Sequence, residues 1–169
     1  MVTLVQDGQK ARTVWNLTER RAQLEDLPSL IRLLFEDELG QTRESKVPLY
    51  DDDYIRAFDQ IESDRNQYLM VVEQDHEIVG TCHLTMIPSL TFKGRLRMQI
   101  EAVRVSAKYR GQGIGTWMMN RAILYAQKHD ATILQLTTNK QRKRAKAFYE
   151  RMGFESTHEG MKLYLQVNE

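Results

Sequence analysis

The sequence predicts one mixed α/β domain, because strand-length and helix-length patterns alternate along almost all of the chain. The chain has 169 residues, of which 41% are hydrophobic, so it can bury a sizeable core. A glycine-rich turn also lies between an apolar strand and an amphipathic helix. We therefore treat residues 1–169 as a single domain in which the polar residues 1–11 form a frayed end.

A first strand and two helices are expected in the N-terminal part of the chain. Residues 13–18 alternate in polarity and predict a strand at a sheet edge. The first helix begins near Pro28, which is tolerated in a first turn, and ends near Gly40. Three aspartates at residues 51–53 cap a second helix, which residues 64–66 close. The inward-facing side chains of the two helices are Leu27, Leu30, Ile31, Leu34 and Phe35, and then Tyr54, Ile55, Phe58 and Ile61.

A predicted hairpin precedes a long central strand. Residues 68–72 and 77–86 are the strands of the hairpin, and residues 74–76 supply its turn. Residues 88–94 then form a loop. Residues 96–105 alternate in polarity, which is typical of a strand with two different faces.

The C-terminal half predicts two helices and two strands. Helical periodicity spans residues 114–126, and residues 133–137 form the next strand. A second helix covers residues 142–152 and stops at Gly153, because glycine readily ends a helix. A hairpin turn then leads into a last strand at residues 161–167.

Residues 110–115 read Arg-Gly-Gln-Gly-Ile-Gly and join the central strand to the next helix. The glycines let backbone N–H groups converge on one point, and the helix adds the positive end of its dipole. This arrangement predicts a site for a phosphate group. A P-loop does not match, because no Gly-Lys is followed by Ser or Thr. A dinucleotide loop does not match either, because Thr116 stands where Gly or Ala is needed.

Further motifs lie on both sides of this turn. Together with Arg110, Gly113 and Gly115 in the turn, they are Glu101-Ala102-Val103-Arg104-Val105 before it, and Asn139, Ala145, Phe148-Tyr149-Glu150 and Gly153-Phe154 after it. These motifs resemble those of the GNAT N-acetyltransferase superfamily over residues 71–165. The resemblance implies a mostly antiparallel central sheet of six to seven strands, about four flanking helices and a splayed pair of central strands. It also implies acetyl-CoA as the co-substrate.

The same resemblance implies the cofactor contacts. The CoA diphosphate would be bound by Arg110, Gly111, Gln112, Gly113, Ile114, Gly115 and Thr116. The main chain of residues 103–105 (Val103, Arg104 and Val105) would bind the pantetheine arm in place of a strand, and Asn139 would contact the cofactor. Arg110 could instead brace the turn, and Asn139 could cap a helix.

Glu101 is the candidate general base. Strict alternation along residues 96–105 would place it on one face with Val103 and Val105, where partial desolvation would raise its pKa and make it a better proton acceptor. The alternative is a salt bridge to Arg97 or Arg104 at the rim of the sheet.

Tyr149 is the candidate general acid. Helical periodicity places it on the inner face of its helix, and the resemblance implies that it lies near the CoA sulfur. A phenol with a pKa of about 10 can protonate a leaving thiolate without being ionised at neutral pH. The alternative is an aromatic core residue whose hydroxyl contacts a carbonyl.

These roles predict direct acetyl transfer to a primary amine in a ternary complex, with no part for Cys82. A second hypothesis is an acyl-CoA-binding regulatory module without efficient transfer. A third, a dehydrogenase-type nucleotide-binding domain, is disfavoured by the glycine spacing.

Composition restricts partners and location. The 24 Lys and Arg nearly balance 23 acidic residues, so no net field favours nucleic acid or an anionic membrane. A single cysteine, four scattered histidines and no long apolar span lead us to expect a cytoplasmic protein without a metal. A homodimer is left open.

The sequence says least about which amine accepts the acetyl group. Acidic residues after the first helix suit a cationic amine but could also be a polar helix end. They are Glu36, Asp37, Glu38 and Glu44, with Arg43 nearby. His83 and Thr85 could line the acceptor cleft, and His158 is an alternative base that we expect to be exposed. The basic run at residues 140–144 could contact CoA, although a solvated helix face is favoured.

Overall fold

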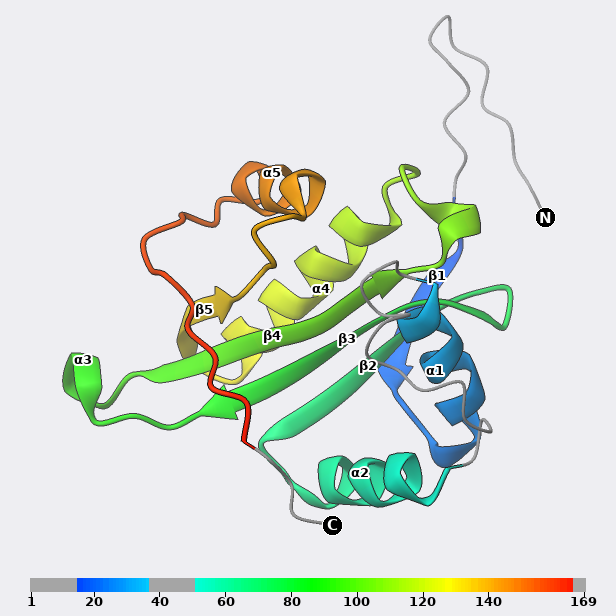
Figure 1. Cartoon of the computed structure of the whole chain (residues 1–169), viewed down its shortest axis with the longest axis horizontal. Helices are drawn as coiled ribbons and strands as arrows, with labels where there is room; N and C mark the ends of the chain where they lie inside the picture. The colour runs from blue at the N-terminus through cyan, green and yellow to red at the C-terminus, as the bar shows by residue number, and fades with distance from the viewer. Residues whose placement is uncertain (1–14, 37–50, 166–169) are drawn as a thin grey trace, which may run out of the picture.

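The computed structural model describes residues 15–36 and 51–165, which form one sheet with helices on both faces (Figure 1). The strands are β1 (Leu17–Arg21), β2 (Gln67–Gln74), β3 (Glu77–Ile87), β4 (Leu96–Val105) and β5 (Ala131–Leu136). The α-helices are α1 (Leu27–Phe35), α2 (Asp52–Ser63), α3 (Thr91–Gly94), α4 (Ile114–Lys128) and α5 (Lys143–Arg151). Two short 3₁₀ helices are η1 (Leu24–Asp26) and η2 (Ala107–Tyr109).

The sheet has the strand order β1-β2-β3-β4-β5. The first four strands are antiparallel, and β5 runs parallel to β4. The mixed, mostly antiparallel architecture predicted from the sequence is therefore confirmed. The numbers differ, because the described residues form five strands and five α-helices instead of six to seven strands and about four helices.

The predicted last strand at residues 161–167 is wrong for the part that the structure describes. Residues 155–165 form neither a helix nor a strand, and Figure 1 draws them as a plain trace that is not one of the strands of the sheet. The large apolar side chains of this segment are 79–95% exposed; they are Met161, Leu163, Tyr164 and Leu165. Alternating polarity yields a strand only where a neighbouring edge completes its hydrogen bonds, and this segment has no such partner in the described structure.

Other element boundaries shifted by a few residues. The first strand spans Leu17–Arg21 instead of residues 13–18, and it lies at the sheet edge as predicted. Helix α1 ends at Phe35, while the predicted end at Gly40 lies outside the described residues. The predicted loop at residues 88–94 contains the single exposed turn α3. That all 169 residues form one domain stays a prediction.

Two apolar clusters hold the helices against the two faces of the sheet. On one face, the fully buried Met118 and Met119 of α4 pack in one cluster with Met98 and Ile100 of β4. On the other face, Val71 of β2 belongs to a cluster of side chains from α1 and α2 that includes Leu30, Ile31 and Phe58. Each such buried side chain contributes about 1.5–3 kcal/mol to folding. The sheet is therefore a fixed platform between two helical layers.

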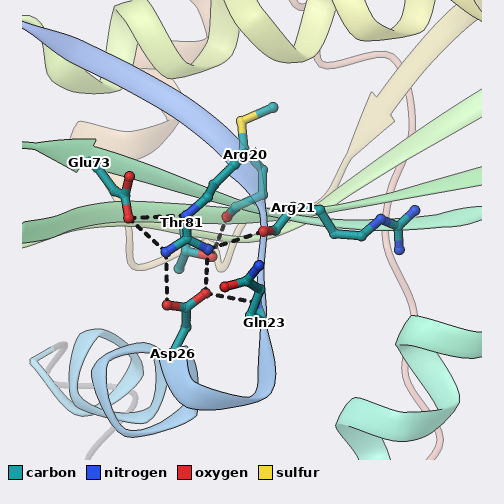
Figure 2. A network of polar contacts seen from close by, with 7 residues as sticks. Arg20, Arg21, Gln23, Asp26, Glu73 and Thr81 are labelled. Carbon is teal, nitrogen blue, oxygen red and sulfur yellow. Dashed lines mark hydrogen bonds and ion pairs between the residues drawn. The ribbon is translucent and has the colours of Figure 1, made fainter. Parts of the chain in front are cut away.

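A partly buried ion network ties β1 and β2 to the start of α1 (Figure 2). Arg20 donates to both carboxylate oxygens of Asp26, at 2.6 and 2.9 Å, and to Glu73 at 2.6 Å. The Gln23 N–H also donates to Asp26, at 2.7 Å. Burial alone would raise the pKa of Asp26, but these hydrogen bonds outweigh burial and lower that pKa below its usual value. The ionised form of Asp26 therefore stabilises the fold.

We expect Asp26→Asn to lower the free energy of unfolding at pH 7 by about 1–3 kcal/mol, because it weakens a charged hydrogen-bond network. Since the pKa of Asp26 is depressed in the folded state, this stabilisation is present above the ordinary carboxyl pKa of 3.8 and is lost as the pH falls through the folded-state pKa. Urea denaturation of both proteins from pH 7 downward checks this, and the two free energies should converge at the acid end.

Asp53→Asn is the matched control, because the Asp53–Arg56 pair is exposed on both sides. It should change the free energy of unfolding much less. An equal effect of the two substitutions, or a deficit for Asp26→Asn that is constant with pH, would contradict this account.

Candidate functional site

The glycine-rich turn lies between the end of β4 and the start of α4, as predicted. We call residues 110–116 the phosphate cradle. Gly111 and Gly113 have φ values of 76° and 89°, in the left-handed region that only glycine adopts readily. Helix α4 begins directly after Gly113. The two glycines therefore let the chain enter a long helix through a tight turn.

The backbone N–H groups of residues 111–116 have no hydrogen-bond acceptor within the described part of the chain, and the first N–H bonded in α4 is that of Trp117, to the Gly113 carbonyl at 3.0 Å. Groups at a helix N-terminus carry the positive end of the helix dipole. The cradle can thus bind an anion through its main chain.

Contacts from distant segments brace the cradle and the residue that precedes it. The Tyr109 hydroxyl donates to Glu77 at 2.7 Å, and the Trp15 indole N–H donates to the Gln112 carbonyl at 3.2 Å. The Trp15 and Tyr109 rings also meet edge to face, with centroids 5.7 Å apart. Sequence reasoning missed these residues, because no local pattern pairs Trp15 with a residue 97 positions later. The bracing fixes the turn before any ligand binds.

Gly115 has a different role from Gly111 and Gly113. A Cβ at this position would lie 3.6 Å from Phe148 Cζ and 3.8 Å from Val105 Cγ2, which are ordinary contact distances. Neither space nor backbone conformation therefore requires glycine here. These distances do show that α4 begins close to Val105 of β4 and Phe148 of α5.

β4 and β5 separate before β4 ends. Their pairing runs from Leu96 to Ile100, whose partner is Leu136, the last residue of β5. Beyond Ile100, β4 is in register with β3 alone, through Glu101, Arg104 and Val105. The carbonyls of Val103 and Val105 instead accept hydrogen bonds from the side chains of Arg104 and Arg110, both at 2.9 Å. This second half of β4 is an open edge that an extended ligand could occupy.

A β-bulge at Ala102 changes which side chains share a face of β4. Ala102 has a φ of 48°, and the register with β3 shifts between the pairs His83–Glu101 and Thr81–Arg104. As a result Val103 and Val105 pack on the core cluster that contains Met98 and Ile100. The predicted shared face of Glu101 and these valines is therefore wrong, because strict alternation does not continue through a bulge.

Glu101 is exposed, so the predicted partial desolvation is also wrong. It lies directly opposite His83 on β3, and the two side chains therefore share a face of the sheet. Burial lowers the pKa of His83, and the negative charge of Glu101 offsets part of this shift. His83 Nε2 is buried and has no hydrogen-bond partner among the described residues. This pair is the titratable part of the site on β3 and β4.

Further polar groups lie on the same face of the sheet. Gln135 of β5 donates to Gln99 of β4 at 2.8 Å, and Thr85 of β3 is the partner of Gln99 in the antiparallel ladder. His83 and Thr85 are two positions apart on β3, so their side chains lie on the same face of the sheet, as expected from the sequence. The surface around Glu101 can therefore contact a polar acceptor.

Tyr149 is on the partly buried face of α5, where its ring lies 5.3 Å from Phe148 and 6.1 Å from Phe154. Burial raises the pKa of Tyr149 above its usual value, and the positive charges of Arg104 and Arg142 offset part of this shift. The phenol is consequently protonated at neutral pH. It can act as a proton donor or as a packed aromatic residue.

Asn139 lies in the turn before α5. Its side-chain oxygen accepts from the Gln141 N–H, and its carbonyl accepts from the Arg142 N–H, both at 2.9 Å. Asn139 therefore stabilises the turn that precedes α5, whose first residue is Lys143. In the basic run that follows, Lys140, Lys143 and Arg144 are exposed, as expected for a solvated surface.

The remaining candidates fall in different places. Glu36 follows α1, and its carboxylate accepts from the Ala107 N–H at 2.6 Å. Asp37, Glu38, Arg43 and Glu44 lie outside the described residues. His158 is exposed, as expected, and its ring contacts the Thr157 hydroxyl at 2.7 Å.

Cys82 is buried, and burial raises the pKa of its thiol to about 12. A thiol with such a high pKa is a poor nucleophile at neutral pH. In residues 15–36 and 51–165, no three His, Cys, Asp or Glu side chains gather in a way that could hold a metal ion. The same residues include no helix with the length and apolar character needed to cross a membrane.

Two curated relatives are both described as uncharacterized N-acetyltransferases. The chain is 42% identical to a protein from Methanocaldococcus jannaschii over 57 residues, which is 34% of this chain and 25% of that protein. It is 27% identical to a protein from Archaeoglobus fulgidus over 135 residues, which is 77% of this chain and 87% of that protein. The chain thus matches only a quarter of the M. jannaschii protein but most of the A. fulgidus protein.

A solved structure from Bacillus halodurans, described as a transcriptional regulator, is 40% identical to this chain. It superposes with a TM-score of 0.86 over 89% of this chain and 100% of its own. The model of the acetyltransferase (GNAT) family matches residues 28–154, which include the cradle, β4 and α5. These residues make up most of the chain, and the chain therefore belongs to the acetyltransferase (GNAT) family.

Proposed function

We propose that this protein transfers the acetyl group of acetyl-CoA directly to a primary amine while both substrates are bound. The observation that carries the proposal is the set of unpartnered N–H groups at residues 111–116, placed beside the open edge of β4. The CoA diphosphate would bind the cradle through these N–H groups, and Thr116 could add its hydroxyl. The pantetheine arm would lie along residues 103–105, where its amides could bond the main chain.

In the proposed reaction, the amine nitrogen attacks the carbonyl carbon of the thioester. A C–N bond forms and the C–S bond breaks, and the electron pair of that bond leaves with the CoA sulfur. Glu101 removes the proton that the amine must lose, through water, and Tyr149 donates a proton to the thiolate. A main-chain N–H of the open edge could stabilise the oxyanion.

Two features support direct transfer over a covalent enzyme intermediate. Cys82 is buried and its thiol pKa is high, so it is poorly suited to accept an acetyl group. Tyr149 is protonated at neutral pH, as a proton donor to sulfur must be. Arg110 Nε donates to the Val105 carbonyl and Nη2 lies 3.5 Å from the Glu36 carbonyl, which would leave Nη1 for a phosphate.

A second candidate function is an acyl-CoA-binding regulatory module without efficient transfer. It is favoured by the B. halodurans relative, which is 40% identical and is described as a transcriptional regulator. Release of free CoA thiol across a panel of polyamines, amino acids, aminoglycosides and peptide amines separates the two candidates. Turnover with any amine supports the enzyme, whereas tight acetyl-CoA binding without turnover on the whole panel supports the module.

Gly113→Ala should weaken acetyl-CoA binding about tenfold, because a side chain at a φ of 89° costs about 1–2 kcal/mol and would reorient the cradle N–H groups. Gly115→Ala is the matched control, since its Cβ would make only ordinary contacts and its affinity should stay within about twofold. Isothermal titration calorimetry measures both. If the wild-type protein and both variants bind acetyl-CoA with equal affinity, the cradle is not part of the acetyl-CoA site.

Tyr149→Phe should lower kcat about a hundredfold and leave the Kd of acetyl-CoA unchanged, because only the proton donor is lost. Steady-state assays of thiol release with calorimetry measure the two quantities. An unchanged kcat would reject this role and would leave Tyr149 as a packed aromatic residue.

Glu101→Gln should lower kcat about a hundredfold, while His83→Gln should lower it by less than about fivefold. The two substitutions are a matched pair, because the residues lie opposite one another on adjacent strands. The same assay compares them at saturating acetyl-CoA. If His83→Gln is the more damaging change, the base is His83 and the assignment to Glu101 is wrong.

A further inference from the structure

We propose that Glu36 is a positioning residue for acetyl-CoA. From the end of α1, its carboxylate holds the segment that leads into the phosphate cradle and so sets the direction of the cradle N–H groups. This inference rests on the function proposed above. It assigns a binding role to a residue more than 70 positions before the cradle.

The Glu36 carboxylate caps η2, the short helix between β4 and the cradle. One of its oxygens accepts from the Ala107 N–H at 2.6 Å, and the other lies 3.4 Å from the Ser106 hydroxyl. Ser106 occupies the N-cap position of η2 but makes no capping bond of its own. A carboxylate from α1 therefore supplies the acceptor that the local sequence does not.

Glu36 also lies beside the arginine of the cradle. Arg110 Nη2 is 3.5 Å from the Glu36 carbonyl and 4.0 Å from its carboxylate, while Arg110 Nε donates to Val105 at 2.9 Å. The guanidinium is thus fixed between the end of α1 and the end of β4. Its position at the cradle depends on both elements.

Two carboxylates hold the ends of η2. Glu36 binds the first residue of this helix, and Glu77 accepts from Tyr109, the last residue, at 2.7 Å. Because η2 runs directly into the cradle, a shift of its first turn would move the N–H groups that follow. A preorganised site loses affinity when the groups that hold it are removed.

The cavity beside Glu36 offers a control residue. This cavity of about 320 Å³ is lined by side chains from β1, η1, α1, the β2–β3 hairpin and Ser106, and Glu73 of β2 is one of its lining residues. Glu73 bonds Arg20 in the network of Figure 2, and within the described residues it makes no hydrogen bond or ion pair with η2 or the cradle. Its removal should affect stability without affecting the cradle.

Three substitutions of Glu36 distinguish the effect of side-chain length from the effect of its negative charge. Glu36→Asp keeps the charge but is one methylene too short to reach Ala107, whereas Glu36→Gln keeps an acceptor oxygen at the same reach. We expect Glu36→Asp and Glu36→Ala to raise the Kd of acetyl-CoA about tenfold, and Glu36→Gln to stay within about threefold. The value of kcat at saturating acetyl-CoA should stay within about twofold in all three.

Calorimetry with acetyl-CoA measures the Kd of each variant, and thermal unfolding measures its Tm. Glu73→Ala should lower Tm and keep the wild-type Kd. The inference would be overturned if Glu36→Asp bound acetyl-CoA with the wild-type Kd. It would also be overturned if Glu36→Gln lost as much affinity for acetyl-CoA as Glu36→Asp. If Glu36→Ala does not fold, the Asp and Gln variants still decide. Failure of the wild-type protein to bind acetyl-CoA would instead reject the proposed function.

Discussion

The early separation of β4 from β5 is the constraint on which the rest of the site depends. Pairing stops at Ile100 and Leu136, and residues 101–105 continue with a partner on one side only. Unpaired main-chain groups are costly unless water or a ligand satisfies them. The start of α4 lies near the same stretch, since a Cβ at Gly115 would lie within ordinary contact distance of Val105 and Phe148. An open strand edge and a helix N-terminus therefore meet at one place, and an extended ligand with a diphosphate at one end could use both.

The local backbone irregularities in this region have separate effects. Gly111 and Gly113 adopt left-handed conformations at no steric cost and let the chain turn into α4. Ala102 adopts one at a cost of about 1–2 kcal/mol, which the surrounding sheet must hold in place. The bulge turns Val103 and Val105 into the core and leaves Glu101 exposed beside His83. One strained residue thus allows the same strand to pack Val103 and Val105 in the core and to expose the carboxylate of Glu101.

Local patterns predicted most of the fold and the position of the cradle. Glycine spacing, helix periodicity and the Asp51 cap act between near neighbours, so the sequence alone contains them, and Asp51 does accept from the Asp53 N–H. The bulge at Ala102 could not be predicted, because alanine carries no signal for a left-handed backbone and the register with β3 decides it. The last strand failed for a related reason: its apolar alternation is present, but pairing needs a neighbouring edge. The bracing of the cradle by Trp15 and Glu36 joins distant segments and leaves no local pattern.

An NMR titration of the backbone amides tests the central claim most directly. Acetyl-CoA should shift the amide resonances of both residues 103–105 and residues 111–116, because the pantetheine arm and the diphosphate would each bind main-chain groups. Acetyl-pantetheine, which lacks the diphosphate, should shift only the resonances of residues 103–105. Binding of acetyl-CoA that leaves residues 111–116 unshifted would contradict the account.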